Sequence, residues 1–287
     1  MKNKGILMTM LSAILFGFMP IFAKIAYLGG INYYSLVFLR SMFALIFISI
    51  FILIKKISIK INFKDFINLF FLSLIGYTLT QLTLFASYTY ISTGVATTLH
   101  FIYPVCIMTA NILFFKEGIN KNKVFALILA IIGISMLSIN KNIKIDIRGV
   151  FIAIISGILY SYYMLVIEHT KIKNMNSVVM TFYLLLFSMI FLGFGSLKFE
   201  LNFNFNYLSW FMGMIIALLC SIFAVILLQM GIKEIGSSTA SILSAFEPIV
   251  SVILGVIIFR ESITINIFLG IVFVIVSVLI VNFNKKH

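Results

Sequence analysis

Long apolar runs dominate this 287-residue chain and constrain its fold more than any other feature. A transmembrane helix needs about 20 consecutive, mostly apolar residues. Ten runs of this kind follow one another with short polar segments between them: residues 5–27, 32–54, 66–87, 94–115, 123–140, 149–167, 175–197, 207–232, 237–259 and 264–283. The pattern predicts an all-α integral membrane protein with ten transmembrane helices and no soluble domain.

The composition excludes most soluble classes of protein. Hydrophobic residues make up 62% of the chain and charged residues only 10%, too few to cover the surface of a soluble domain. The net charge is +13, but the basic residues lie mainly in short segments between apolar runs, so we expect no nucleic-acid partner. Cys106 and Cys220 lie within apolar runs, away from other metal ligands, and are expected to pack as small core residues.

The basic residues also predict the orientation, because lysine and arginine are enriched in cytoplasmic loops. In the first half, alternate loops carry all of the loop lysines and the opposite loops carry none: Lys2, Lys4, Lys55, Lys56, Lys60, Lys64, Lys116, Lys121 and Lys123. The second half divides its basic residues between the two sides, so the predicted orientation depends on the first half. We expect a multi-pass protein of the cell membrane with both termini in the cytoplasm.

The sequence aligns with itself, without gaps, at a shift of 144 residues. Matching positions are Gly5 with Gly149, Pro104 with Pro248, and Phe115-Lys116-Glu117 with Phe259-Arg260-Glu261. This predicts two repeats, residues 1–144 and 145–287, each with five spans. Because five is odd, the second repeat enters the membrane in the opposite sense, an inverted arrangement found in many secondary transporters.

Two segments carry the repeated pattern most clearly: ASYTYISTGVATTLHFIYPVCIMTANILFFKEGI and SSTASILSAFEPIVSVILGVIIFRESI. Each has a helix rich in small residues, a mid-helix proline and a glutamate just past the helix end. This pattern resembles the signature of the drug/metabolite transporter superfamily, EamA type. The residues that carry the resemblance are Pro104 with Glu117, Pro248 with Glu261, and Arg40 in the second run. The resemblance implies a ten-helix exporter or exchanger of metabolites with a central cavity between its halves.

Ionisable side chains inside apolar runs are candidates for function, because insertion of one at a helix centre costs about 2.5–3.5 kcal/mol. Glu247 lies in mid-run directly before Pro248, which cannot donate a helical hydrogen bond and so frees a carbonyl. The resulting polar spot suits a cation, a substrate amine or a proton; pairing with a neighbouring helix is the alternative. Arg40 suits either a structural pairing or a substrate carboxylate, and both readings stay open.

Polar residues at helical spacing predict the walls of the cavity. His100 and Tyr103 lie one turn apart, and the repeat maps them onto Ser244 and Glu247, so we expect the two pairs to face each other. For His100, a packing role is the alternative. Further candidates for substrate binding lie on shared helical faces in mid-run: Tyr77, Gln81, Tyr160, Tyr163 and Gln229.

Together these features favour a secondary transporter, an exporter or exchanger of small metabolites such as amino acids, working by alternating access around a mid-membrane cavity. The sequence contains no phosphate-binding glycine-rich loop, zinc motif or nucleophile constellation, so we expect neither an enzyme nor a cofactor. A lipid-carrier flippase of the same superfamily and a non-transporting membrane partner are the alternatives. A small-molecule substrate and membrane lipid are the expected partners, while proton coupling and a monomeric or homodimeric state stay open.

Overall fold

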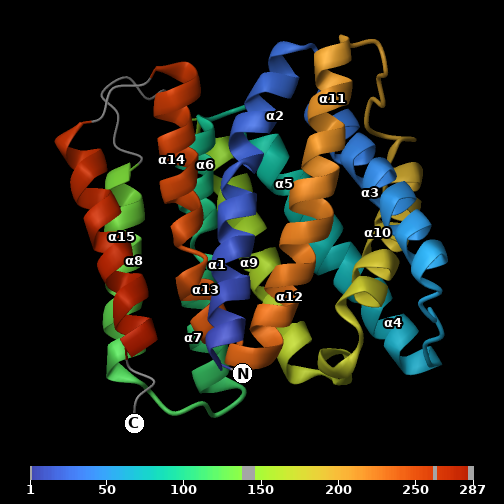
Figure 1. Cartoon of the computed structure of the whole chain (residues 1–287). Helices are drawn as coiled ribbons and strands as arrows, with labels where there is room; N and C mark the ends of the chain where they lie inside the picture. The colour runs from blue at the N-terminus through green and yellow to red at the C-terminus, as the bar shows by residue number, and fades with distance from the viewer. Residues whose placement is uncertain (1, 138–145, 261–263, 284–287) are drawn as a thin grey trace.

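The computed structural model describes residues 2–137, 146–260 and 264–283, and these form helices with no strand among them (Figure 1). The first half, residues 1–144, contains α1 (Lys2–Gly17), α2 (Met19–Leu28), α3 (Tyr33–Lys55), α4 (Phe63–Phe71), η1 (Leu72–Leu79), α5 (Thr80–Ser87), α6 (Thr93–His100), α7 (Tyr103–Leu113) and α8 (Lys121–Leu137). The second half, residues 145–287, contains α9 (Ile147–His169), η2 (Lys171–Asn174), α10 (Ser177–Gly195), α11 (Tyr207–Ile216), η3 (Ala217–Phe223), α12 (Ala224–Ile235), α13 (Ser237–Leu243), α14 (Phe246–Phe259) and α15 (Ile265–Phe283).

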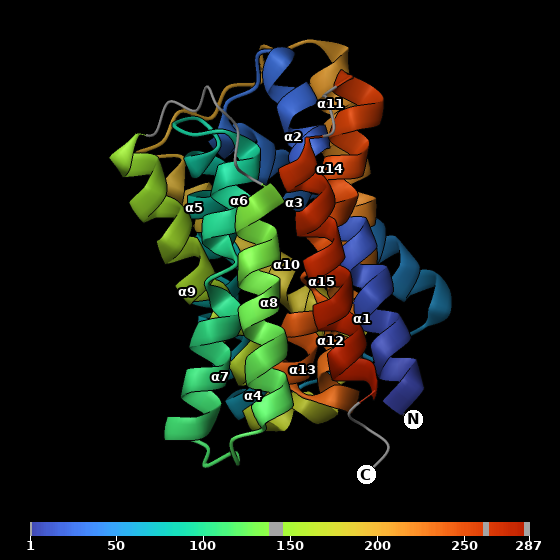
Figure 2. The ribbon, with the colours of Figure 1, turned by 90° about the vertical axis from the view of Figure 1, so that its left-hand side faces the viewer.

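The predicted all-α membrane architecture is confirmed. Within the described residues, eight helical stretches are long and apolar enough to cross a membrane, and Ile265–Val281 of α15 forms a shorter apolar stretch. The α8 helix, with 17 residues, lies beside α15 (Figures 1 and 2). The ten predicted runs thus correspond to ten helical stretches of the described chain, several of them made of consecutive helices. The last residues of the run 123–140 and Glu261 lie outside the described residues.

The two halves run in opposite senses. The α1 helix starts at one end of the molecule, the lower end in Figure 1, and α15 returns to that same end. The first helix of the second half, α9, instead starts near the upper end and descends (Figure 2). An inverted pair of five-span repeats therefore builds the molecule.

Backbone irregularities recur at the same places in both halves. The segments η1 and η3 are π-helical, and a shift of 144 residues carries Leu79, the last residue of η1, onto Phe223, the last residue of η3. Likewise, Phe101 in the interruption between α6 and α7 maps onto Ala245 between α13 and α14. Each interruption precedes a proline that cannot donate to the carbonyl four residues earlier, which explains why the helix stops there.

One interruption has no counterpart. The first span breaks at Phe18, just before Pro20 at the start of α2. The repeat-related position of Pro20 is Met164, which lies within the unbroken α9 helix. The presence of a proline in only one half accounts for this difference.

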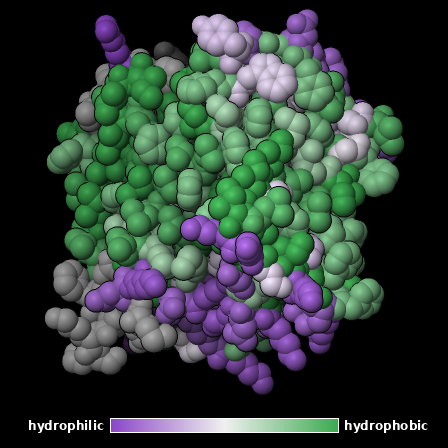
Figure 3. All heavy atoms as spheres, turned by 45° about the vertical axis from the view of Figure 1, so that its right-hand side comes forward, coloured by the Kyte–Doolittle hydropathy of each residue, from purple (hydrophilic) through white to green (hydrophobic). Residues whose placement is uncertain are grey.

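The surface matches a membrane protein. Large apolar side chains are exposed over many helices, among them Leu53 at 75%, Phe114 at 77% and Ile257 at 68%. A soluble monomer rarely exposes so continuous an apolar surface. Figure 3 shows apolar residues over most of one face and hydrophilic residues gathered mainly at the lower end.

The α8 and α15 helices pack closely against each other through two glycines. A Cβ atom on Gly133 would lie 2.8 Å from the carbonyl oxygen of Gly270, and one on Gly270 would lie 2.7 Å from that of Gly133. Small residues at such a contact let two membrane helices approach backbone to backbone. The last helices of the two halves are therefore joined directly.

Candidate functional site

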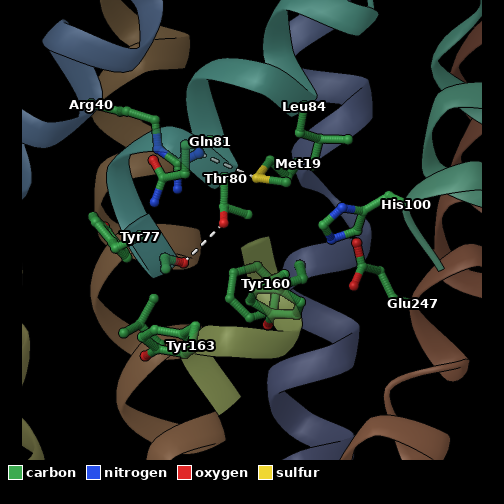
Figure 4. Close-up of a pocket in the computed structure, with 13 residues that line it drawn as sticks. Met19, Arg40, Tyr77, Thr80, Gln81, Leu84, His100, Tyr160, Tyr163 and Glu247 are labelled. Atoms are coloured by element: carbon green, nitrogen blue, oxygen red, sulfur yellow. Dashed lines mark hydrogen bonds between the residues drawn. The ribbon is translucent and has the colours of Figure 1, made fainter. Parts of the chain in front are cut away.

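A narrow cavity lies between the two halves, with about 50 Å³ open to the centres of water-sized molecules (Figure 4). Its walls come from both: Phe16, Met19, Arg40, Gly76, Tyr77, Thr80, Gln81, Leu84 and His100 from the first half, and Tyr160, Tyr163, Val225 and Glu247 from the second.

The cavity straddles the axis that relates the repeats. Three pairs of lining residues occupy repeat-related positions: Phe16 with Tyr160, Met19 with Tyr163, and Gln81 with Val225. Equivalent positions of the two halves therefore meet at this one place. A site on such an axis lies where relative motion of the halves changes access from one membrane side to the other.

Arg40 provides a buried positive charge at one side of the cavity. Its side chain, on α3, is 1% exposed; Nε donates to Oγ of Ser221 (2.9 Å) and Nη1 to Sδ of Met19 (3.3 Å). The guanidinium carbon lies 5.2 Å from the centre of the Phe85 ring. Among the described residues no carboxylate lies within 4.0 Å of Arg40. Because a guanidinium stays protonated, this charge is available to an anionic group in the cavity.

Glu247 provides a carboxyl group at another side of the cavity. It lies in the first turn of α14, directly after the helix interruption, and is 8% exposed. The N-terminal end of a helix favours a negative charge at this position. Figure 4 shows Glu247 beside the His100 ring, on the opposite side of the cavity from Arg40.

His100 presents a defined acceptor to the cavity. Its Nδ1 lies 2.7 Å from Oγ of Ser156, and that hydroxyl already donates to the carbonyl of Ala153 (2.6 Å). The hydroxyl must therefore accept from Nδ1, which leaves Nε2 of a neutral imidazole as the acceptor. This arrangement suits a ligand N–H or O–H near Glu247.

Aromatic rings form the wall near Glu247. The Tyr160 ring stacks on Tyr163 with centroids 5.7 Å apart, and it meets Tyr103 edge-on at 4.9 Å and His100 at 5.3 Å. Such rings bury apolar area and hold fixed positions through their mutual contacts. The wall gives the cavity an apolar surface beside its charged groups.

Seven of the ten side chains predicted to bind substrate line this cavity: Arg40, Tyr77, Gln81, His100, Tyr160, Tyr163 and Glu247. The other three are not among its lining residues. Tyr103 is 1% exposed and packs behind Tyr160. Ser244 donates to the carbonyl of Ala240 in its own helix (3.0 Å).

Gln229, the third, supports the wall from behind. Its Nε2 donates to Oη of Tyr163 and to Oγ1 of Thr181, at 3.1 Å each. The side chain is fully buried and fixes the Tyr163 ring rather than meeting the cavity. We therefore assign it a positioning role.

The helix interruptions explain why Tyr103 and Ser244 lie off the cavity. The expected shared face assumed a continuous helix through each pair. Instead α6 ends at His100 and α7 starts at Tyr103, while Ser244 ends one helix and Glu247 starts the next. Only one member of each pair, His100 and Glu247, lines the cavity.

Six lining residues were missed by the sequence reasoning: Phe16, Met19, Gly76, Thr80, Leu84 and Val225. Most are apolar or small and carry no chemical signal in a membrane helix. The repeat provides a different signal for three of them, since Phe16, Met19 and Val225 occupy positions equivalent to Tyr160, Tyr163 and Gln81. Within the described residues, no cluster of three histidine, cysteine or acidic side chains could hold a metal ion.

Comparisons with known proteins agree with this architecture. The sequence model of the EamA-like transporter family matches the chain twice, over residues 3–139 and 147–283. A solved structure titled "Crystal structure of protein" superposes with a TM-score of 0.85, covering 100% of this chain and 99% of that chain at 12% identity, which is a likeness of fold. Among curated proteins, none matches the chain.

Proposed function

Because the chain belongs to the EamA-like transporter family, we propose that it is a secondary transporter, an exporter or exchanger, of zwitterionic metabolites such as amino acids. Members of this family are transporters, and the chain is a multi-pass membrane protein. The observation that carries the choice of substrate is the separation of Arg40 and Glu247 across one buried cavity (Figure 4).

Arg40 is the proposed partner of a substrate carboxylate. A guanidinium binds a carboxylate through two parallel hydrogen bonds, and here no described carboxylate occupies that position. Leaving a buried charge without an opposite charge is costly, so a bound carboxylate would relieve this cost. Ser221 and Met19 hold the guanidinium in place meanwhile.

Glu247 is the proposed partner of the substrate amine, with the acceptor nitrogen of His100 beside it. An ammonium group bound there would neutralise the carboxylate. In the absence of substrate a proton does the same, so Glu247 also offers a route to proton coupling. The rings of Phe16 and Tyr160, with Leu84, line the cavity and would contact the apolar part of the substrate.

Alternating access would follow from the inverted halves. The π-helical segments η1 and η3 and the paired interruptions near Phe101 and Ala245 are places where the backbone departs from the α-helix. Such departures recur at functional sites and absorb changes in direction. We propose that the halves rock about these places.

We further propose that the lower end faces the cytoplasm. The helix ends and loops at that end carry Lys55, Lys60, Lys116, Lys171 and Lys173, and hydrophilic surface gathers there in Figure 3. Cytoplasmic loops of membrane proteins are enriched in lysine and arginine.

The test uses purified protein in liposomes that contain a labelled amino acid. Counterflow is first measured with a panel of amino acids, and the best substrate is then compared with its amide, which lacks the carboxylate, and its N-acetyl form, which lacks the amine. We expect each derivative to be transported at least about tenfold more slowly, since each loses one charge-assisted contact. Equal rates for all three, or no transport of any panel member above protein-free liposomes, would refute the proposal.

A further inference from the structure

Below the cavity, polar side chains join the two halves near the lower end. At their centre is Asn111 on α7 of the first half, which is 1% exposed. Its Nδ2 donates to Oγ of Ser237 (3.1 Å) and Oγ of Ser238 (2.7 Å), at the start of α13. Its Oδ1 accepts from Nε2 of His169 (2.8 Å), at the end of α9. All three partners belong to the second half.

Two carboxylates extend these contacts. Glu168 accepts from the backbone N–H of Ser237 (2.8 Å) and from its hydroxyl. Glu117 accepts from Oγ of Ser238 (2.9 Å) and from Nζ of Lys123 (2.7 Å). Partial burial acts to raise the pKa of Glu117, but the bonds from Lys123 and Ser238 outweigh it and hold the pKa below its ordinary value. Glu117 is therefore charged at neutral pH.

We call these seven side chains the lower-end network: Asn111, Glu117, Lys123, Glu168, His169, Ser237 and Ser238. Four of its hydrogen bonds cross between the halves. A ring contact adds to them, since Phe115 of the first half stacks on His169 with centroids 3.5 Å apart and planes 4° from parallel.

The network lies between the cavity and the lower end, on the helices that carry cavity residues. Ser237 precedes Glu247 by ten residues and Glu168 follows Tyr160 by eight. At a rise of 1.5 Å per residue these separations correspond to roughly 15 Å and 12 Å. A molecule leaving the cavity toward the lower end would meet the network.

The upper end has no counterpart of three side chains of the network, including the central Asn111. A shift of 144 residues carries Asn111, Ser238 and His169 onto Gly255, Gly94 and Ile25. Side chains of glycine and isoleucine neither donate nor accept hydrogen bonds. The two ends of the molecule therefore differ in chemistry although their backbones are related.

We propose that the lower-end network is the gate that closes the cavity from the lower end, with Asn111 as its central positioning residue. The proposal rests on the proposed function, because it assumes that the halves separate at this end during transport. When they separate, water replaces each broken hydrogen bond, so opening costs little per bond and is readily reversed. A polar gate next to the aqueous side can thus open and close repeatedly without a large barrier.

The test measures access to the cavity and needs no substrate. Cys106 and Cys220 are replaced by Ala, a single reporter cysteine is introduced as Val225→Cys in the cavity wall, and a membrane-impermeant maleimide is applied to either side of sealed vesicles. Lys60→Cys, in an exposed loop of the lower end, identifies which side is the lower one. With Asn111→Ala we expect labelling from the lower side to be about tenfold faster, because three cross-half bonds are lost.

Ser238→Ala provides a milder second variant, with an expected increase of about threefold. Asp146→Asn is the matched control, because it breaks the ion pair with Arg148 (2.7 Å) within one half, and it should leave labelling unchanged. The proposal of a gate would be overturned if both network variants were labelled at the rate of the parent protein. It would also be overturned if labelling became equally faster from both sides. If the parent protein transports nothing but the variants still label faster from the lower side, the proposed function fails and the gate stands.

Discussion

The two halves of this chain have the same backbone plan but different chemistry. Their π-helical segments end at Leu79 and Phe223, and their interruptions lie at Phe101 and Ala245, all at a shift of 144 residues. The same shift carries the cavity cation Arg40 onto Leu184 and the cavity acid Glu247 onto Tyr103. Each charge is therefore supplied by one half alone.

This difference teaches how a symmetric frame acquires a direction. The shared backbone shape follows from the π-helical segments and from the prolines Pro104 and Pro248, which occupy equivalent positions in the two halves. The charges follow from single positions that the halves do not share. A zwitterion in such a cavity has one favourable orientation, which two identical halves could not provide.

The largest expected effect comes from removing the charge of the second half. Glu247→Gln should reduce transport of zwitterionic substrates by about 100-fold, because the amide cannot neutralise an ammonium group or carry a proton. Initial rates in liposomes between pH 5 and 9 measure this. Glu234→Gln, an exposed acid on α12, is the matched control. Transport that matches the parent at every pH would remove Glu247 from the mechanism.

Removing the charge of the first half should have the next largest effect. Arg40→Leu copies the residue of the second half and should weaken transport of carboxylate substrates by about 30-fold. Thermal stability should stay equal or rise, since no described carboxylate loses its partner. The transport rate of Arg40→Lys should lie between those of the parent protein and Arg40→Leu. A clearly lower melting temperature in Arg40→Leu would favour a structural role instead.

The contact between the last helices of the halves should be sensitive to size. Gly133→Val places a side chain against the carbonyl of Gly270 and should destabilise the fold by about 1–3 kcal/mol. Thermal unfolding in detergent measures this. Gly193→Val is the matched control, because a Cβ at Gly193 meets no atom within 4 Å. Equal losses for both variants would contradict the close packing of α8 on α15.

The smallest effect is expected where the halves differ by one hydroxyl. Tyr160→Phe copies Phe16 and retains the ring contacts to Tyr103 and His100. Transport should change by less than about threefold, since the ring and its contacts are kept and only the hydroxyl group is lost. The converse variant, Phe16→Tyr, should be equally mild. A tenfold loss in Tyr160→Phe would instead indicate direct contact between its hydroxyl and the substrate.

The spans were predictable because they depend on a property summed over about 20 residues, which tolerates uncertainty at each position. The buried charges were predictable for a similar reason, since Arg40 and Glu247 stand out in apolar surroundings. Facing directions were less predictable. The interruption between His100 and Tyr103 changes the angle between them, and a proline in the sequence signals a break without giving its geometry.

Apart from the approach of His100 and Glu247 that the repeat indicates, contacts between distant segments could not be predicted. Nothing in the sequence around Asn111 indicates that it meets Ser237 and His169, because those contacts depend on how whole helices pack. Apolar lining residues such as Leu84 could not be predicted either, since leucine occurs throughout the membrane spans.

The π-helical segments also affect which changes in chain length the protein can tolerate. A π-helical turn holds about one residue more than an α-helical turn, so deletion of one residue from η1 or η3 can convert the segment to a regular α-helix. Gln81 and Val225, which follow these segments and line the cavity at repeat-related positions, would then keep their direction. A one-residue deletion here should thus disturb the cavity less than a deletion in α9 ahead of Tyr160, which would turn every later side chain of that unbroken helix by about 100°.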